Sequence, residues 1–282
     1  MAHIIIIYDA LLRPDTAGTL CRAALTRLGH DVVHYPPLRR EGDTLRFGGY
    51  AGLSLGADLY LQIDDDIAYP APDVAGKKAY WCIDVHRMDA MVGGMTRLEK
   101  MRGFDMVFSA QKDMALKLGL PWLPLACDER LWRRLPQAEN RYDWCFVGNL
   151  HTPERRELFA QLAQRFPRCF VGNAYGREQN AVYNASTLIL NLTVGNDVNM
   201  RFFEAQAAGG TLVSNRPGNG EDELFSHVAY YDDPDSLMAL MAELLANPRQ
   251  AKTLGYNQWR ETTARHTYAL RMRTLLEECG IV

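Results

Sequence analysis

Short apolar runs alternate with longer mixed stretches along the whole chain, beginning with a β-branched run at residues 3–8. Apolar runs of this length, bounded by polar or glycine-bearing loops, are typical of buried strands. In the first half they predict strands at 3–8, 31–35, 57–63, 78–83 and 105–109, with 121–125 closing the half. In the second half they predict strands at 141–147, 168–171, 188–192, 211–214 and 228–231.

The stretches between these runs have helical composition, and proline or glycine marks several of their ends. The expected helices span 19–28, 111–118, 153–165, 179–185, 200–208 and 235–246, with a turn at 221–225 and two more helical segments at the end. Residues 39–49 are polar and glycine-bearing, which favours a hairpin. Strands that alternate with helices form parallel sheets with right-handed crossovers. Because the pattern restarts after a linker at 128–140, we expect an α/β protein with two Rossmann-like lobes.

Composition and charge exclude several classes of partner. The 282 residues carry a formal net charge of −3, so no imbalance favours nucleic acid or a membrane surface, and we expect no nucleic-acid partner. The N-terminus has no basic segment ahead of its short apolar run, and no run is long enough for a transmembrane segment. None of the six cysteines lies within four residues of another, which excludes zinc-ribbon and C-x-x-C spacings. A reducing, cytoplasmic location is the simplest interpretation.

An ordered series of motifs in the second half carries a family resemblance. The segments are Y-D-W-C-F-V-G-N (142–149), Y-N-A-S-T-L-I-L-N-L (183–192), N-M-R-F-F-E-A-Q-A-A-G-G (199–210), E-D-E-L-F (221–225) and Y-Y-D-D-P-D-S-L (230–237). They resemble the group 1 glycosyltransferases, within them the spore-maturation-type (CgeB-like) branch. The resemblance is looser in the first half, where it covers D-L-Y-L-Q-I-D-D-D (58–66) and Y-W-C-I-D (80–84).

This resemblance implies a GT-B-like fold, in which the sheets of the two lobes face a central cleft. It implies an acceptor-side lobe at 1–127, a nucleotide-sugar-binding lobe at 128–265, and a C-terminal helix at 266–282 that packs back on the first lobe. The implied function is a metal-independent glycosyltransferase, hexosyltransferase-like. It would move a sugar from a nucleoside diphosphate sugar to an acceptor hydroxyl on a saccharide, a protein or a small molecule.

Arg201 and Glu204 are the strongest candidates for nucleotide contacts. They are three residues apart on one predicted helix and therefore share a face. The preceding residues Asn196 and Asn199 favour a capped helix N-terminus, which attracts anions, and Arg201 adds a planar fork of donors to a diphosphate. The carboxylate of Glu204 can accept both ribose hydroxyls, which is the role of the corresponding Glu in the resembled family. The alternative is an exposed Arg–Glu pair on a helix surface.

Asn196 marks a departure from the family pattern. The wider family carries a second Glu eight positions before the ribose Glu, near the donor sugar, and that position is Asn196 here. An asparagine can hydrogen-bond a sugar hydroxyl but supplies no charge. The resemblance therefore does not fix the donor-sugar contact or the stereochemistry of transfer.

The remaining donor-site candidates follow the predicted strands of the second lobe. Glycine after a strand lets the backbone approach a phosphate, and glycine loops and tyrosines can face a sugar or a base. The candidates are Gly148, Asn149, Asn173, Tyr175, Tyr183, Gly218 and Gly220. Arg155 and Arg156 can bind the diphosphate or lie on a solvated helix face, and Tyr183 can stack on the base or be structural.

On the acceptor side, Asp84 and His86 follow an apolar strand and are two residues apart, so in an extended segment they project to one side. A carboxylate or imidazole there can accept the acceptor proton; the alternative is a capping Asp and a surface His. The triplet at 64–66, with Asp64 and Asp65, has ligands suited to Mg²⁺. Because the nucleotide features lie in the second lobe, we expect capping or acceptor-lining acids and no metal. A sugar-nucleotide epimerase or hydrolase, or a silent nucleotide-sugar binder, remain alternatives.

Overall fold

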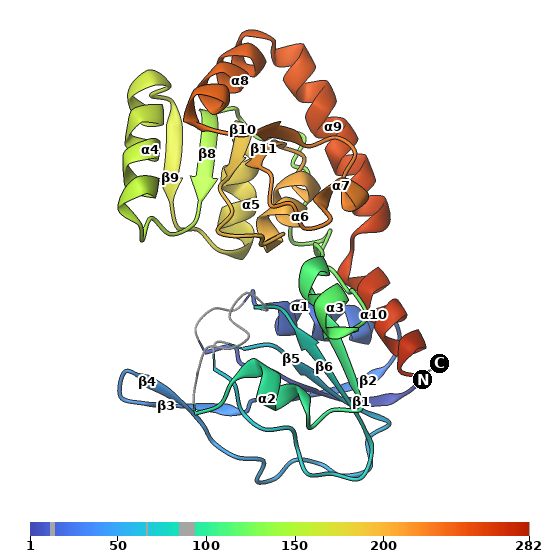
Figure 1. Cartoon of the computed structure of the whole chain (residues 1–282). Helices are drawn as coiled ribbons and strands as arrows, with labels where there is room; N and C mark the ends of the chain where they lie inside the picture. Colours follow the sequence, from blue (N-terminus) through green and yellow to red (C-terminus); the bar gives the residue numbers. More distant parts are fainter. Residues whose placement is uncertain (12–14, 66, 85–93, 282) are drawn as a thin grey trace. The chain divides into compact units, whose positions relative to one another are not determined.

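The computed structural model describes residues 1–11, 15–65, 67–84 and 94–281. The chain divides into two compact units, each built around a five-stranded sheet (Figure 1). Unit 1 contains Met1–Leu125 together with Tyr268–Val282, and unit 2 contains Ala126–Thr267.

The sheet of unit 1 is fully parallel, with the strand order β2-β1-β5-β6-β7. Its strands are β1 (His3–Ile7), β2 (Asp31–Tyr35), β5 (Leu59–Ile63), β6 (Lys77–Cys82) and β7 (Met106–Ser109). The four isoleucines of β1 are at most 1% exposed, as expected of a strand between two neighbours that is covered on both faces. A two-stranded antiparallel hairpin, β3 (Leu38–Glu41) with β4 (Thr44–Phe47), confirms the predicted excursion.

The helices of unit 1 are α1 (Ala17–Arg27), α2 (Arg97–Met101), α3 (Lys112–Leu118) and α10 (Tyr268–Glu278). The last helix packs against α1 in unit 1 (Figure 1), and Arg271 Nε donates to the carbonyl of Pro124 at 2.8 Å. Lys77 Nζ also donates to the carbonyl of Cys279, which fixes the end of α10 to the start of β6. The end of the chain therefore completes the core of the unit that its beginning forms.

Two features of unit 1 lie outside the strands and helices that the sequence predicts. Residues 121–125, which close the first half, form a single bridge from Trp122 to Ser109, because Pro121 and Pro124 have no N–H to continue a ladder. Helix α2 was not predicted, because five residues are too few to show a helical period. Its start has a recognisable signal nonetheless, since Thr96 and Glu99 form a capping box.

The sheet of unit 2 is also parallel, with the order β12-β11-β10-β8-β9. Its strands are β8 (Tyr142–Val147), β9 (Cys169–Gly172), β10 (Ser186–Asn191), β11 (Thr211–Asn215) and β12 (Ala229–Tyr231). The helices are α4 (Pro153–Arg165), α5 (Gly176–Asn184), α6 (Met200–Ala207), α7 (Glu221–Leu224), α8 (Pro234–Ala246) and α9 (Pro248–Arg265). Both sheets confirm the predicted class, an α/β protein with two Rossmann-like lobes.

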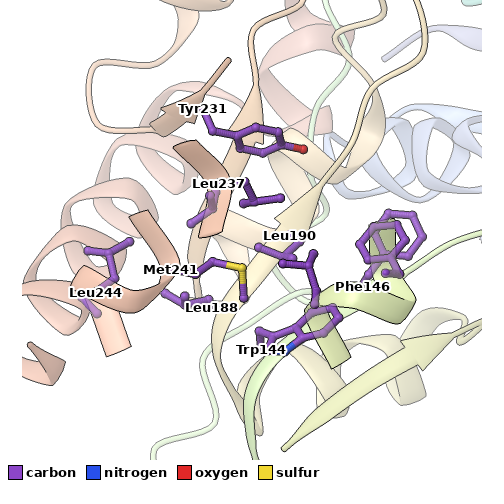
Figure 2. Close-up of a cluster of buried hydrophobic side chains, with 12 residues drawn as sticks. Trp144, Phe146, Leu188, Leu190, Tyr231, Leu237, Met241 and Leu244 are labelled. Carbon is purple, nitrogen blue, oxygen red and sulfur yellow. The ribbon is translucent and has the colours of Figure 1, made fainter. Parts of the chain in front are cut away.

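The core of unit 2 holds the strands that lead to the candidate site. Side chains of β8 and β10, among them Trp144 and Leu190, pack against Met241 and Leu244 of α8 (Figure 2). Each such fully buried large side chain contributes about 1.5–3 kcal/mol to stability. Tyr231 extends this core to the carboxyl end of the sheet, where its hydroxyl donates to the carbonyl of Asn191 at 3.0 Å. The ends of β8 and β10 are therefore held by the core.

Among the described helices, none combines the length and the apolar character that crossing a bilayer requires.

Candidate functional site

Helix α6 begins at the carboxyl end of the unit 2 sheet, where ligands of parallel sheets bind. Asn199 is its N-cap, and its Oδ1 accepts from the amide of Arg201 at 3.1 Å. The Nδ2 of Asn199 donates to Asn191 Oδ1 at the end of β10 (3.2 Å). The structure thus gives Asn199, a predicted ligand residue, a clear role in fixing where α6 starts.

Arg201 lies over the end of β8, with its guanidinium held from several directions. Its Nη1 donates to Asn191 Oδ1 at 2.7 Å, and its Nη2 donates to the carbonyl of Val147. The guanidinium carbon lies 4.7 Å from the ring centroid of Phe146, a cation–π distance. A guanidinium has five N–H donors, and the bonds to Asn191 and Val147 use two of them. Arg201 is therefore a fixed cation at this edge of the sheet with donors to spare.

Arg155, in the first turn of α4, reaches the same ring. Its Nη groups donate to the carbonyls of Asn149 and Leu192, and its guanidinium carbon lies 5.9 Å from the Phe146 centroid. Burial, with the charge of Arg201, lowers the pKa of Arg155. In the part of the chain that the structure describes, neither arginine forms an ion pair with an acid. Two neighbouring cations without an acid make this edge attractive to an anion.

Gly148 leaves the space that the Arg201 guanidinium occupies. A Cβ at this position would lie 2.4 Å from Arg201 Nη2 and 3.1 Å from Phe146 Cζ. The placement of Arg201 therefore requires a glycine after β8. This is a second reason for glycine at position 148, beside the predicted close approach of a phosphate. Asn149, the next residue, and Asn173 after β9 are exposed.

A Gly148→Ala substitution tests this packing. The methyl group must displace the guanidinium, and we expect about 10–100-fold weaker use of a nucleotide-sugar donor, as for other displaced positioning groups. The loss of unfolding free energy should stay at about 1–3 kcal/mol. The control is Gly172→Ala at the end of β9, where a Cβ meets its nearest atom at an ordinary 3.7 Å. Steady-state kinetics and urea unfolding of both variants give the answer, and equal kinetics would contradict the role of Gly148.

Glu204 lies one turn further along α6 and is 6% exposed. Its Oε2 accepts from Gln179 Nε2 at 2.7 Å, and Gln179 also donates to the hydroxyl of Tyr183 at 2.8 Å. Gln179 was missed by the sequence analysis, although its i, i+4 spacing to Tyr183 on α5 was a signal. It orients the carboxylate of Glu204, for which the sequence predicts a ribose contact.

The two tyrosine candidates have different surroundings. Tyr183 is completely buried, and burial raises its pKa above the usual range. Its ring belongs to the interior, so the stacking role proposed for it is corrected to the structural alternative. Tyr175 is 48% exposed at the N-cap position of α5, where its ring is accessible.

The loop after β11 contains Gly218 and Gly220, with φ of +71° and +89°. These left-handed conformations favour glycine, which agrees with the predicted turn. The amides of Gly218 and Asn219 both donate to the carboxylate of Glu221, a residue that the sequence analysis did not select. Asn196 is exposed, and its carbonyl accepts from Asn219 Nδ2 at 2.7 Å.

In unit 1, Asp84 follows β6 and its side chain is 41% exposed. One carboxylate oxygen lies 3.5 Å from Arg97 Nη2, and its amide donates to Asp64 Oδ2 at 3.0 Å. His86 lies outside the described residues, so the expected acid–imidazole pair stays a prediction. Asp84 itself is an accessible carboxylate at the carboxyl end of a parallel strand.

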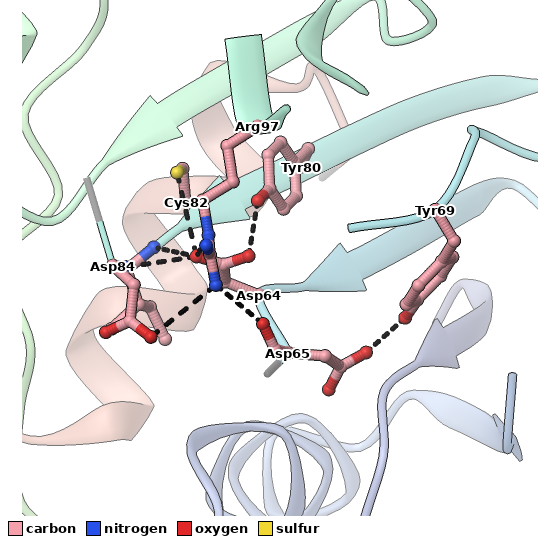
Figure 3. A network of polar contacts seen from close by, with 8 residues as sticks. Asp64, Asp65, Tyr69, Tyr80, Cys82, Asp84 and Arg97 are labelled. Atoms are coloured by element: carbon pink, nitrogen blue, oxygen red, sulfur yellow. Dashed lines mark hydrogen bonds and ion pairs between the residues drawn. The ribbon is translucent and has the colours of Figure 1, made fainter. Parts of the chain in front are cut away.

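Asp64 is the centre of a buried network at the ends of β5 and β6 (Figure 3). Its carboxylate accepts from Arg97 Nε at 2.7 Å, from the hydroxyl of Tyr80 and from the amide of Ile83. Burial alone would raise its pKa, but Arg97 and Lys100 hold the pKa below the usual value. Asp64 is therefore an ionised structural acid that caps the loop after β6. Asp66 lies outside the described residues.

The pKa of Asp65 is shifted in the opposite direction from that of Asp64. Burial raises its pKa to about 7, although the charge of Lys100 and hydrogen bonds from Tyr69 and the Asp9 amide act against this shift. Because the pKa of Asp65 is higher in the folded state than its ordinary value of 3.8, proton binding stabilises the folded protein. This stabilisation is complete below pH 3.8 and is lost as the pH rises towards 7. Wild-type unfolding free energy should therefore contain a component that falls by up to about 1.4 kcal/mol per pH unit between pH 4 and 7.

The Asp65→Asn variant should lack this component. Urea unfolding from pH 4.5 to 7.5 measures it as the difference between the two stability curves, in which the histidines cancel because both proteins contain them. Asp73→Asn, at an exposed position of the same unit, is the control and should leave the slope unchanged. Parallel wild-type and Asp65→Asn curves would show that Asp65 is ionised throughout.

Comparison with known proteins identifies the class. Residues 132–277, more than half of the chain, match the Glycosyl transferase-like family, and the chain belongs to that family. It is thus an enzyme of the glycosyltransferase class. No curated protein sequence matches the chain significantly.

Solved structures give the fold. Sucrose-phosphate synthase from Thermosynechococcus elongatus is 13% identical with a TM-score of 0.65, and 99% of each chain is covered. An α-glucosyltransferase in complex with UDP and a 13-mer DNA containing a HMU base is 12% identical with a TM-score of 0.71, again over 99% of each chain. Anabaena Alr3699/HepE in complex with UDP and glucose is 10% identical with a TM-score of 0.65, over the whole of both chains. The fold is GT-B, as the resemblance implied.

The expectation of no nucleic-acid partner was wrong, because this fold does not exclude nucleic acid as a substrate. Proteins of this fold include the α-glucosyltransferase bound to DNA and a DNA-modifying β-glucosyltransferase. A net charge of −3 is a sum over the whole chain and does not describe how charge is distributed on its surface.

Proposed function

We propose that this protein transfers a sugar from a nucleoside diphosphate sugar to an acceptor hydroxyl without a metal ion. The observation that carries the proposal is the pair Arg155 and Arg201, two half-buried cations beside the Phe146 ring without an acid partner among the described residues. Arg201 lies in the first turn of α6. Their charge, with the helix N-terminus, suits a diphosphate. In our proposal these groups take the part that a divalent cation has in other transferases.

Glu204 supplies the second half of the donor contact. Its carboxylate, oriented by Gln179, would accept hydrogen bonds from the ribose hydroxyls. As the bond between sugar and diphosphate breaks, negative charge grows on the leaving phosphate. Arg201 is fixed before the reaction and stabilises that charge without reorganisation. Asp84 would accept the proton of the acceptor hydroxyl.

The proposal also includes the branch of the family, the cellular environment and the nucleotide of the donor. The motifs at 183–192 and 199–210 support membership of the spore-maturation-type (CgeB-like) branch. The free state of all six cysteines supports a reducing, cytoplasmic environment. UDP is the first nucleotide to test, since it is present in two of the solved neighbours named above, the α-glucosyltransferase and HepE.

A thermal-shift screen of the whole chain against UDP, GDP, dTDP and their sugars, with Mg²⁺ or with EDTA, tests the proposal. We expect stabilisation by one nucleotide series that is the same in both buffers. No stabilisation by any nucleotide would overturn the proposal, and stabilisation that requires Mg²⁺ would overturn metal independence.

Acceptor assays separate the alternatives. Donor turnover without any acceptor would favour an epimerase or a hydrolase. Binding without transfer to saccharides, proteins, small molecules or DNA with hydroxymethylated bases would favour a silent binder, to which the uncharged Asn196 gives some support. Transfer to one acceptor class would establish the proposed reaction and name its substrate.

A further inference from the structure

Glu221 is a buried carboxylate that the proposed chemistry does not use. It is 2% exposed at the start of α7. Its Oε1 accepts from the amide of Gly218 at 2.9 Å, and its Oε2 accepts from the amide of Asn219 at 2.7 Å. Burying a carboxylate is costly unless hydrogen bonds compensate, and bonds to an ionised acceptor are the strong ones. Both oxygens are thus committed to the loop that precedes them.

These two bonds determine the shape of the loop. Gly218 and Gly220, both in left-handed conformations, lie on either side of Asn219. Consecutive amides that converge on one anion form a concave backbone arrangement, which the bound anion stabilises. Because the anion here is Glu221 itself, the loop is formed before any substrate binds.

The side chain of Asn219 transmits this shape to the neighbouring loop. Asn219 is 4% exposed, and its Nδ2 donates to the carbonyl of Asn196 at 2.7 Å. Closer to the sheet, Asn215 and Thr193 exchange two hydrogen bonds of 2.8 and 3.0 Å. The loops after β10 and β11 are therefore joined both at the strand ends and at Asn196.

In the proposed function Asn196 is the candidate contact to the donor sugar, as the family resemblance implies. A neutral amide offers no long-range attraction to a sugar hydroxyl, and its hydrogen bond weakens steeply with distance and angle. Its contribution depends on being held in one place. The bonds from Glu221 to the Asn219 amide and from Asn219 Nδ2 to the Asn196 carbonyl hold the backbone from which this side chain extends.

We propose that Glu221 is a positioning residue for the donor sugar, acting through Asn219 on Asn196. This inference rests on the proposed function. It predicts a specific separation of effects: the sugar end of the donor site depends on Glu221, whereas the nucleotide end at Arg201 and Glu204 does not.

A Glu221→Gln substitution in the full chain tests the inference, with UDP and UDP-glucose as probes in titration calorimetry. Glutamine keeps the size, but its NH₂ group must face one of the two loop amides. We expect UDP affinity within about 2-fold of wild type and UDP-glucose affinity about 10-fold weaker, since the lost placement affects one or two hydrogen bonds to the sugar. The matched control is Glu223→Gln, an exposed position on the same α7, which should leave both affinities unchanged.

Asn219→Ala is the second variant, because it keeps the buried carboxylate and removes the bond from Asn219 Nδ2 to Asn196. It should show the same selective loss, so the inference stays testable if Glu221→Gln does not fold. Equal losses for UDP and UDP-glucose, or no loss in either variant, would overturn the role of Glu221. A wild-type protein that binds neither probe would instead count against the proposed function with uridine donors.

Discussion

Alanine in place of Arg201 is expected to lower kcat/KM for a nucleoside diphosphate sugar by about 10²–10³-fold, the usual loss when one preorganised donor to a developing charge is removed. The guanidinium is fixed by Asn191, Val147 and the ring of Phe146. Because phosphate charge grows as the sugar leaves, most of the loss should appear in kcat. Initial rates at varied donor concentration measure both parameters.

Arg156→Ala is the matched control for Arg201→Ala. Arg156 lies on α4 and is exposed, and its Nη1 donates to the carbonyls of Leu150 and His151 in the loop before this helix. Its removal should change kcat/KM by less than about 3-fold, in keeping with an exposed charge. Arg201→Lys should recover part of the activity, since it keeps the charge but not the planar fork. A kcat that stays at the wild-type value in Arg201→Ala would contradict the assignment.

Replacement of Glu204 by glutamine is expected to weaken nucleotide binding by about 10–100-fold, which corresponds to about 1.4–2.8 kcal/mol. A carboxylate accepts both ribose hydroxyls through charge-assisted bonds, whereas a glutamine offers one neutral acceptor. The neighbouring Gln179 would in addition face an amide in place of the carboxylate oxygen that it now contacts at 2.7 Å. Titration calorimetry with UDP measures the loss.

A nucleotide without ribose hydroxyls isolates this contact. Wild type and Glu204→Gln should bind 2′,3′-dideoxy-UDP with similar affinity, because the hydroxyls that distinguish the two side chains are absent. An equally large loss with dideoxy-UDP would show that Glu204 acts on the structure of unit 2 and not on the ribose. Glu178→Gln, at an exposed position of α5 beside Gln179, is the control and should bind UDP as wild type does.

The predicted and observed folds agree most closely where local signals are strong. Helix α4 was predicted with its observed bounds, because Pro153 at the first position and the cap Thr152 mark its start. The strand at 31–35 was also predicted with its observed bounds. The sequence analysis missed α2, because five residues are too few to show a helical period.

The sequence by itself determined the α/β class, the two lobes and the placement of Arg201 and Glu204 on one helix, because periodicity and spacing along the chain are local properties. The tertiary structure decided which polar groups meet: Gln179 with Glu204, Arg155 with Arg201, and Arg97 with Asp64. It also decided that Tyr183 is interior and that Glu221 serves its own loop. Such pairings join residues far apart in the chain or depend on burial, and burial is set only when the whole unit has packed.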